Sequence, residues 1–447
     1  MPQIHVDFSK KLGPIKPMHG VGQPPLLGVS TEKFSYLSEA AIPYSRLHDV
    51  AGWFGGNMFA DIPNIFRDFD ADETDPASYD FAFTDILIKG LVENNCMPVY
   101  RLGVTIENFH QIRAYRVFPP KDFAKWARIC EHIIRHYNEG WADGFHYGIE
   151  YWEIWNEPDS SVIIEDNPMW KGTPEQFFEL YKVTSRHLRK CFGDSIKIGG
   201  YGACGFYAIY DPAANGAVAE GKQRIPEAEL MALINRRKGY VNFFHRFIQF
   251  VREEQLPFDF FSYHSYADAA DTLKMQHYVE EHLALQGLAD TEIHLNEWNP
   301  CPSPQTRGTA IAASNIAAML CAMQNARMAM MCYYDARIGL GVYGGLFNPL
   351  TYAPFPTYYT LKAFGKLYRL GSQVEATWEG SGLHVLAAAG DSGRGVLMTN
   401  LGPDTEVETN LNPDMTAYLI DDTHLMEPIP LDPTRFSFPT NATLYFA

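Results

Sequence analysis

The sequence has few cysteines, and they follow no pattern. The seven stand far apart and include no Cys-x-x-Cys pair, at positions 96, 130, 191, 204, 301, 321 and 332. Disulfide frameworks and cysteine-based zinc sites need regular spacings, so neither is expected, and a reduced, cytoplasmic protein is predicted. His132 and His136 lie four residues apart on a predicted helix but lack a third ligand, so we interpret them as a solvated helix face.

Long hydrophobic runs are also missing. No uninterrupted apolar stretch approaches the roughly 20 residues that cross a membrane. The N-terminal stretch MPQIHVDFSKKLG lacks the apolar segment of a signal peptide. We therefore expect neither a membrane anchor nor secretion.

Positive charge is scarce. The chain has 36 lysines and arginines against 53 acidic residues, which gives a net charge of -17. Nucleic acids and anionic membranes are bound by basic surfaces, so we expect neither as a partner. Aromatic residues, in contrast, make up 14% of the chain. Their side chains can fill a large core or form flat platforms for sugar rings.

Strand-like and helix-like segments alternate eight times along most of the chain. Short apolar runs predict strands near 18–22, 42–47, 97–102, 149–156, 195–200, 258–264, 292–297 and 328–334. Amphipathic segments predict helices near 31–39, 80–94, 122–137, 174–191, 240–255, 274–288, 308–326 and 356–369. Eight strand–helix pairs are typical of a (β/α)8 TIM barrel, whose active site lies at the C-terminal ends of the strands.

The character of the sequence changes after Gly371. Residues 373–447 contain short alternating runs separated by Gly, Pro, Asp and Asn, which predicts a small antiparallel β-sandwich domain. Residues 2–8 alternate as an edge strand does and are expected to complete that domain. The predicted organisation is an N-terminal strand at 1–16, a barrel at 17–370 and a β-sandwich at 371–447.

Two glutamates end predicted barrel strands in similar settings. Glu157 lies in YWEIWNEPD, where Pro158 ends the strand and disfavours helical angles at the preceding residue. Glu157 is therefore predicted to be extended at the mouth of the fourth strand. Glu297 lies in HLNEW at the end of the seventh strand. Two carboxyls about 5–5.5 Å apart can cleave a glycosidic bond with retention of configuration.

The motifs WEIWNEPD and HLNEW resemble the acid/base and nucleophile motifs of the large (β/α)8 retaining-glycosidase clan, clan A. Within it the chain most resembles glycoside hydrolase family 39, the β-xylosidase and α-L-iduronidase family. The resemblance implies that Glu157 is the general acid/base and Glu297 the nucleophile. It also implies that Asn156 hydrogen-bonds the sugar 2-hydroxyl. The reaction needs no metal and no cofactor.

The end of the sixth predicted strand resembles the clan's His-x-Tyr element. His264 and Tyr266 point the same way along a strand, and both are candidate substrate-binding residues. Tyr266 is expected to donate a hydrogen bond to Glu297 and to hold it anionic. Core packing is the alternative for both residues.

Arg46 and His48 end the second predicted strand and resemble the clan's Arg and His there. The resemblance implies that Arg46 supports Glu297 and that His48 contacts a sugar hydroxyl. The alternative for Arg46 is an ion pair with a barrel carboxylate such as Glu153. Arg101 on the third strand is a similar candidate.

The eighth strand departs from the xylosidase pattern, which has a Trp platform and acidic residues there. The chain instead has Tyr-Tyr-Asp-Ala-Arg at 333–337. Tyr334 could stack on a sugar and Asp335 could accept its hydroxyls, whereas Arg337 favours a carboxylated or sulfated sugar. Trp298, directly after Glu297, is expected either to wall the sugar site or to pack in the barrel.

Three long connections, at 48–79, 157–173 and 201–239, exceed the roughly 2–6 residues usual in α/β units. They follow the second, fourth and fifth strands, so they lie on the catalytic face and are expected to wall the pocket. Inert decoration of the surface is the alternative.

The sequence predicts a retaining exo-glycoside hydrolase that acts on short oligosaccharides, like a β-xylosidase, through a covalent glycosyl-enzyme. The same glutamates would serve an arabinosidase, glucosidase, galactosidase or uronidase. A transglycosylase, a lyase-like protein and a non-catalytic sugar-binding barrel are the further alternatives. The expected partner is a carbohydrate, and homo-oligomerisation is left open.

Overall fold

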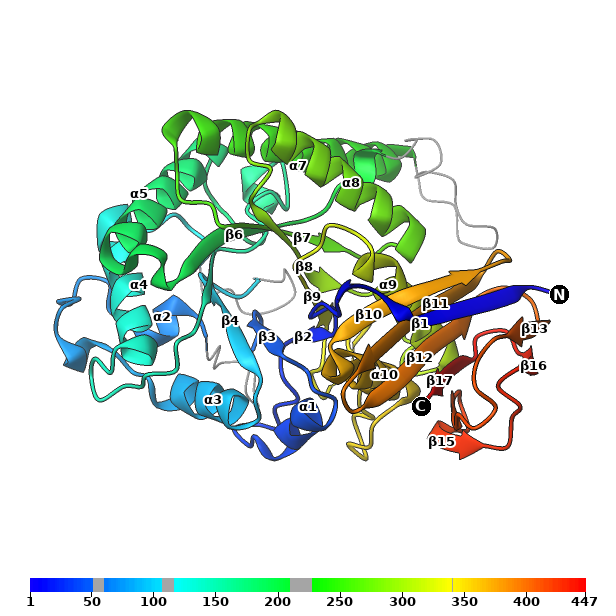
Figure 1. The fold of residues 1–447 in the computed structure, drawn as a ribbon. Coiled ribbons are helices and arrows are strands. Elements are labelled where there is room, and N and C mark those ends of the chain that lie inside the picture. Colours follow the sequence, from blue (N-terminus) through cyan, green and yellow to red (C-terminus); the bar gives the residue numbers. More distant parts are fainter. Residues whose placement is uncertain (51–59, 107–115, 210–226, 340) are drawn as a thin grey trace.

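The computed structural model describes residues 1–50, 60–106, 116–209, 227–339 and 341–447. These residues form a closed barrel of eight parallel strands with helices around it, and a nine-stranded sheet beside it (Figure 1). The predicted (β/α)8 barrel with a mostly antiparallel C-terminal sheet is confirmed. The barrel strands are β2 (Gly20–Gly22), β3 (Tyr44–Leu47), β4 (Met97–Leu102), β5 (Tyr151–Ile154), β6 (Lys197–Ala203), β7 (Phe260–Ser265), β8 (Glu292–Trp298) and β9 (Met330–Tyr334).

Helices follow the barrel strands close to the predicted positions. They are α1 (Ser35–Glu39), α2 (Ile62–Ile65), α3 (Ala82–Glu93), α4 (Phe123–Asn138), α5 (Pro174–Phe192), α7 (Glu227–Glu254), α8 (Ala269–Leu285), α9 (Ala310–Gln324) and α10 (Pro356–Leu370). The prediction missed the short α2, and it placed the first half of α7 in a connection. Among the described residues, no helix has the length and apolar character needed to cross a bilayer.

The helix boundaries have local causes. Thr173 accepts a hydrogen bond from the backbone of Gln176 and completes a capping box, and Pro174 begins α5. Gly371 ends α10 with a φ of 87°, a conformation that disfavours other residues. On α4, His136 is buried and stacks on Phe81. The prediction of a solvated face is therefore wrong for His136.

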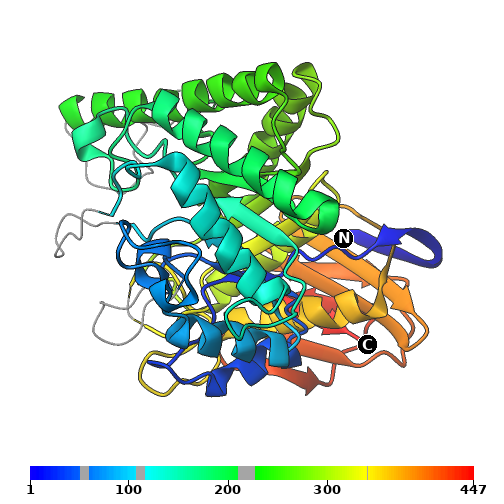
Figure 2. The same cartoon turned by 90° about the vertical axis from the view of Figure 1, so that its left-hand side faces the viewer.

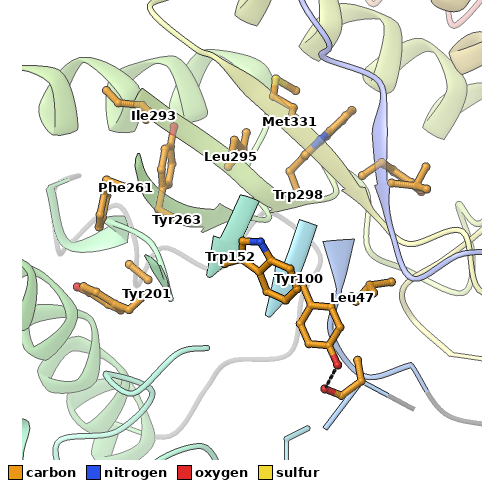
Figure 3. Packing of buried hydrophobic residues seen from close by; sticks show 14 of the residues in the cluster. Leu47, Tyr100, Trp152, Tyr201, Phe261, Tyr263, Ile293, Leu295, Trp298 and Met331 are labelled. Atoms are coloured by element: carbon orange, nitrogen blue, oxygen red, sulfur yellow. Dashed lines mark hydrogen bonds between the residues drawn. The ribbon is translucent and has the colours of Figure 1, made fainter. Parts of the chain in front are cut away.

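The period of two along each strand divides the barrel side chains into two layers. Figure 3 shows the outward layer, in which Leu47, Tyr100, Trp152, Phe261, Leu295 and other buried side chains pack together. The inward layer begins with a small apolar cluster that includes Val99, Tyr151, Phe260, Met330 and Cys332. Polar residues two positions further along the same strands come next, so alternation alone brings Arg46, Arg101, Glu153 and Ser262 inside the barrel.

The nine-stranded sheet places the N-terminal strand among C-terminal ones, in the order β15-β14-β17-β12-β11-β10-β1-β13-β16. Its strands are β1 (Gln3–Pro14), β10 (Ser372–Trp378), β11 (Leu383–Gly390), β12 (Gly393–Asn400), β13 (Thr405–Thr409), β14 (Ala417–Ile420), β15 (Leu425–Ile429), β16 (Arg435–Phe438) and β17 (Thr443–Phe446). One face builds its own apolar core, and Leu386, Leu397 and Tyr445 of the other face join the barrel's core. Figure 2 shows the sheet against one side of the barrel.

Candidate active site

Glu157 and Glu297 meet at the C-terminal end of the barrel, just beyond β5 and at the end of β8. One carboxylate oxygen of each glutamate and a ring nitrogen of His264 all lie within 4.8 Å of one another. The side chains of Glu157 and Glu297 are 18% and 8% exposed. Glu297 is therefore buried and Glu157 partly buried, with the two carboxyls beside each other.

The backbone turns sharply at Glu157. Its φ is 45° and that of Trp155 is 71°, so the predicted extended conformation of Glu157 is wrong. The Glu157 N–H lies 3.1 Å from the carbonyl oxygen of Tyr201 and 3.0 Å from that of Gly202, on the neighbouring strand β6. These hydrogen bonds hold the turn that directs the carboxyl across the barrel mouth.

His264 bridges the two carboxyls. Its Nδ1 lies 2.7 Å from Glu157 Oε1 and 3.1 Å from Glu297 Oε2. Burial opposes protonation of the ring, but the charges of Glu297 and Glu157 outweigh it and raise the pKa of His264. Its observed partners are the two glutamates, and contact of His264 with substrate stays a prediction.

A β-bulge in β8 turns two consecutive residues into the barrel. Tyr263 of β7 pairs with Leu295, but His264 then pairs with Glu297, so Asn296 is the extra residue. Asn296 Nδ2 donates to a buried carboxylate at 2.6 Å, and Glu297 contacts His264. Strict alternation would have turned one of these two neighbours outward. The bulge therefore places Glu297 in the site.

Tyr266 donates its hydroxyl to Glu297 Oε1 at 2.7 Å, as predicted. Its ring packs against that of Tyr343, with centroids 4.9 Å apart, and Tyr343 in turn packs edge-on against Tyr334. Tyr343 was missed because it lies in an irregular segment after β9, where no periodicity relates it to a strand.

Arg46 contacts three partners, so it both pairs with the barrel carboxylate Glu153 and supports Glu297. Its Nε donates to Glu153 Oε2 at 2.7 Å, its Nη1 lies 3.3 Å from Glu297 Oε2 and its Nη2 donates to Asn156 Oδ1 at 2.5 Å. Burial acts to raise the pKa of Glu153, but Arg46 and the donors Ser262 and Asn296 outweigh it and lower that pKa. Glu153 therefore stays charged beneath the site.

Burial raises the pKa of Glu297 to about 7, and the charge of Glu157 adds to this effect, although His264, Arg46 and Tyr266 oppose it. The cluster of Glu157, His264 and Glu297 has the donor atoms of a metal site. The guanidinium of Arg46 also lies 3.3 Å from Glu297 Oε2.

His48 and Tyr334 join through Asp49 at the edge of the site. His48 Nε2 lies 3.1 Å from Asp49 Oδ1, and the Tyr334 hydroxyl donates to Asp49 Oδ2 at 2.9 Å. Burial, together with the charges of Arg101 and Arg46, holds the pKa of His48 well below its usual range. His48 is therefore favoured as a neutral imidazole, and its buried Nδ1 has no hydrogen-bond partner among the described residues.

Asp335 and Arg337 form an ion pair just after β9. Arg337 Nη2 lies 3.2 Å from Asp335 Oδ2, and the Arg337 side chain is 40% exposed. Burial raises the pKa of Asp335 to about 6. A cation with solvent access thus lies beside a buried carboxyl at the barrel mouth.

Two candidate site residues, Trp298 and Arg101, are fully buried and contact other side chains of the barrel. Trp298 is fully buried and packs edge-on against Tyr333, so the structure favours barrel packing over a sugar wall. Arg101 is also fully buried and pairs with Asp61 at 2.6 Å. Neither side chain reaches the two glutamates' open side.

The connection at 157–173 borders a cavity of about 220 Å³ between this loop and α7. Asp159, Asn167 and Asn242 are among its lining residues. Burial raises the pKa of Asp159 to about 7, and the charge of Glu157 adds to the effect. The other two long connections include residues 51–59 and 210–226, which lie outside the described residues.

Comparisons with known proteins agree with the two motifs. The family model described as glycosyl hydrolases family 39 matches residues 3–337. A β-xylosidase of Geobacillus stearothermophilus is 24% identical over 298 residues, which cover 60% of this chain and 50% of that protein. A β-xylosidase of Caldicellulosiruptor saccharolyticus is 24% identical over 277 residues, covering 60% and 48%. The chain spans about half the length of these relatives.

Solved structures share the fold over nearly the whole chain. A glucosidase of Croceicoccus marinus superposes with a TM-score of 0.76 at 18% identity, covering 100% of this chain and 98% of that one. A family 39 β-xylosidase of Caulobacter crescentus gives a TM-score of 0.67 at 16% identity, covering 99% of both chains.

Proposed function

Because the chain belongs to glycosyl hydrolase family 39, we propose that it is a retaining exo-glycoside hydrolase that removes single sugars from short oligosaccharides, as a β-xylosidase does. The observation that carries the proposal is the approach of the Glu157 and Glu297 carboxylate oxygens to within 4.8 Å. Retaining enzymes hold their two carboxyls about 5–5.5 Å apart, whereas inverting enzymes need roughly 6.5–9.5 Å to fit a water.

In the proposed reaction, Glu297 attacks the anomeric carbon while Glu157 protonates the departing oxygen. Glu157 then removes a proton from the water that releases the sugar from Glu297. Tyr266 and Arg46 hold one oxygen each of the attacking carboxylate. His264, bonded to both carboxyls, can carry the positive charge that compensates whichever glutamate is ionised.

The test is the replacement of each glutamate by glutamine, with turnover measured on nitrophenyl glycosides. Loss of general acid catalysis costs about 10²–10⁴-fold, and Glu297→Gln should cost at least as much. Azide should rescue Glu297→Gly and give a product of inverted configuration. Glu165→Gln, an exposed glutamate on the same loop as Glu157, is the matched control and should keep full turnover. Near-normal activity of Glu157→Gln or Glu297→Gln on every cleavable glycoside would rule out the proposed roles.

A uronidase is a second candidate, favoured by Arg337. Its guanidinium is partly exposed, and a guanidinium can pair with a sugar carboxylate. Burial raises the pKa of its present partner, Asp335, to about 6. Turnover should be compared on aryl xyloside, arabinoside, glucoside, galactoside and uronide. If the substrate is a uronide, Arg337→Met should reduce uronide turnover far more than turnover of any neutral glycoside. An equal loss of turnover on all substrates would rule out the uronidase and favour a glycosidase of neutral sugars.

The same two glutamates would also serve a transglycosylase. Product analysis with and without an added acceptor sugar distinguishes the two reactions, because only a transglycosylase transfers most of the sugar to the acceptor.

A further inference from the structure

Three side chains with metal-binding atoms meet on the outer helix layer, far from the catalytic pair in the fold. They are Glu131 of α4 with His187 and Cys191 of α5. A carboxylate oxygen, a ring nitrogen and the thiol sulfur all lie within 4.8 Å of one another. His187 and Cys191 are four residues apart, so they share one face of their helix.

The cluster lies toward the opposite end of the barrel from the active site. Helices α4 and α5 lie side by side (Figure 1) and run antiparallel to the strands. The last turns of α5, which carry Cys191, therefore lie near the N-terminal ends of the strands, whereas Glu157 lies at the C-terminal ends. In this fold the N-terminal face serves stability rather than catalysis.

The three donor atoms are already close to one another. His187 Nε2 lies 2.6 Å from Glu131 Oε2, and Cys191 Sγ lies 3.7 Å from the same nitrogen. The second oxygen of Glu131 accepts a hydrogen bond from Arg135 Nε at 2.8 Å, which fixes the carboxylate. The His187 and Glu131 side chains are 26% and 14% exposed, so an ion can enter from solvent.

We propose that Glu131, His187 and Cys191 form a zinc site that joins α4 to α5, with water as the fourth ligand. Zinc bonds of about 2.0–2.3 Å in tetrahedral geometry place the nitrogen about 3.5 Å from the sulfur and about 3.3 Å from the oxygen. The observed sulfur–nitrogen separation of 3.7 Å already fits. The 2.6 Å nitrogen–oxygen pair has to open by a fraction of an ångström, and the sulfur lies within 4.8 Å of the Glu131 oxygen.

Zinc takes the place of the hydrogen-bonding proton between these groups. Cys191 binds as a thiolate and releases its proton to solvent, His187 binds as the neutral imidazole, and no oxidation occurs. Arg135 keeps its hydrogen bond to the free oxygen of Glu131, as partners of metal-binding carboxylates do. Its charge is also neutralised by Glu139, its partner one turn along α4.

The cluster could also act as a metal-free hydrogen-bonded chain between the helices, and the test separates the two roles. Metal-free protein is titrated with Zn²⁺ against a chromophoric chelator, and with Co²⁺, whose bond to a thiolate gives a charge-transfer absorption. We expect one equivalent bound with micromolar affinity or tighter, the Co²⁺–thiolate band, and a zinc-dependent rise in the unfolding midpoint.

Cys191→Ser and His187→Gln should each weaken binding at least about 100-fold, since removing even an indirect partner of a metal ligand costs 10–100-fold. Both should keep wild-type turnover. Cys301→Ser, at a half-buried thiol far along the chain, is the matched control and should bind zinc normally. The Co²⁺ band also distinguishes this site from the catalytic cluster, which contains no sulfur. Absence of the band, or zinc binding by Cys191→Ser as tight as in the wild type, would overturn the proposal.

Discussion

The hydrogen bond from Tyr266 to Glu297 allows a sharp test of how Glu297, the proposed nucleophile, is kept ionised. Glu297 must be an anion to attack, and burial raises its pKa to about 7. Activity should therefore fall as pH drops through about 7, and this acid limb should appear in kcat/KM. Tyr266→Phe removes a donor that lies 2.7 Å from the carboxylate and stabilises only its charged form.

A hydrogen bond to a charged group contributes about 1.5–3 kcal/mol, and one pKa unit corresponds to about 1.4 kcal/mol. The Tyr266→Phe acid limb should therefore move upward by roughly one to two pH units. At pH 7 the ionised fraction, and with it kcat/KM, should fall roughly 5- to 50-fold, and raising the pH should restore much of the loss.

Tyr263→Phe is the matched control, because Tyr263 lies on β7, three residues before Tyr266, and donates its hydroxyl to Gln276. It should lower stability slightly and leave the acid limb in place. The assay is the pH profile of kcat/KM on an aryl glycoside that the enzyme cleaves. An acid limb in Tyr266→Phe that stays at its wild-type position, or moves to lower pH, would refute the reasoning.

Two further predictions concern stability. Glu153→Gln leaves the buried charge of Arg46 without its main partner. Chemical denaturation should therefore show a loss of about 3–5 kcal/mol in the free energy of unfolding. A loss below about 1 kcal/mol would contradict this prediction. Hydrogen bonds from His294 and Lys197 outweigh burial and lower the pKa of Glu292 from 4.5 to about 2. The stability from this shift, about 2–3 kcal/mol, is present above pH 4.5 and is lost as pH falls toward 2. Urea titrations at several pH values should show that the free energy of unfolding falls less between pH 4.5 and 2 in Glu292→Gln than in the wild type. The same fall in both proteins would exclude Glu292 as the cause.

The barrel was predictable because each of its elements carries a local signal. The apolar run at 97–102 coincides with β4, and Thr173 as N-cap followed by Pro174 marks the start of α5. The placement of Glu157 and Glu297 at strand ends was also predictable, since both glutamates follow apolar runs and precede a proline, Pro158 or Pro300. Gly371 was recognisable as the end of the last helix because glycine readily adopts the positive φ found at such ends.

The finer geometry was not predictable, because it depends on register between strands. The bulge at Asn296 follows from how β8 pairs with β7, and no periodicity in HLNEW reveals it. The bulge also explains Trp298: with Glu297 turned inward, the next side chain faces outward and packs on Tyr333. Tyr343 and the Glu131–His187–Cys191 cluster were missed for a similar reason, since tertiary packing brings their partners together from separate elements.

Arg46 shows why the choice between a structural and a catalytic role was a false one. A guanidinium buried beside a single carboxylate would lower the pKa of that carboxylate strongly, and a nucleophile so stabilised would be a poor one. Glu153 takes the closest contact with Arg46, at 2.7 Å, and leaves Glu297 the longer one, at 3.3 Å. Sharing the cation between two anions lets burial keep the pKa of Glu297 near 7 while Tyr266 still holds the carboxylate in place. The buried Arg46–Glu153 pair thus supports the barrel and also tunes the charge of Glu297, the proposed nucleophile. In Glu153→Gln the acid limb should therefore move to lower pH, opposite to its shift in Tyr266→Phe.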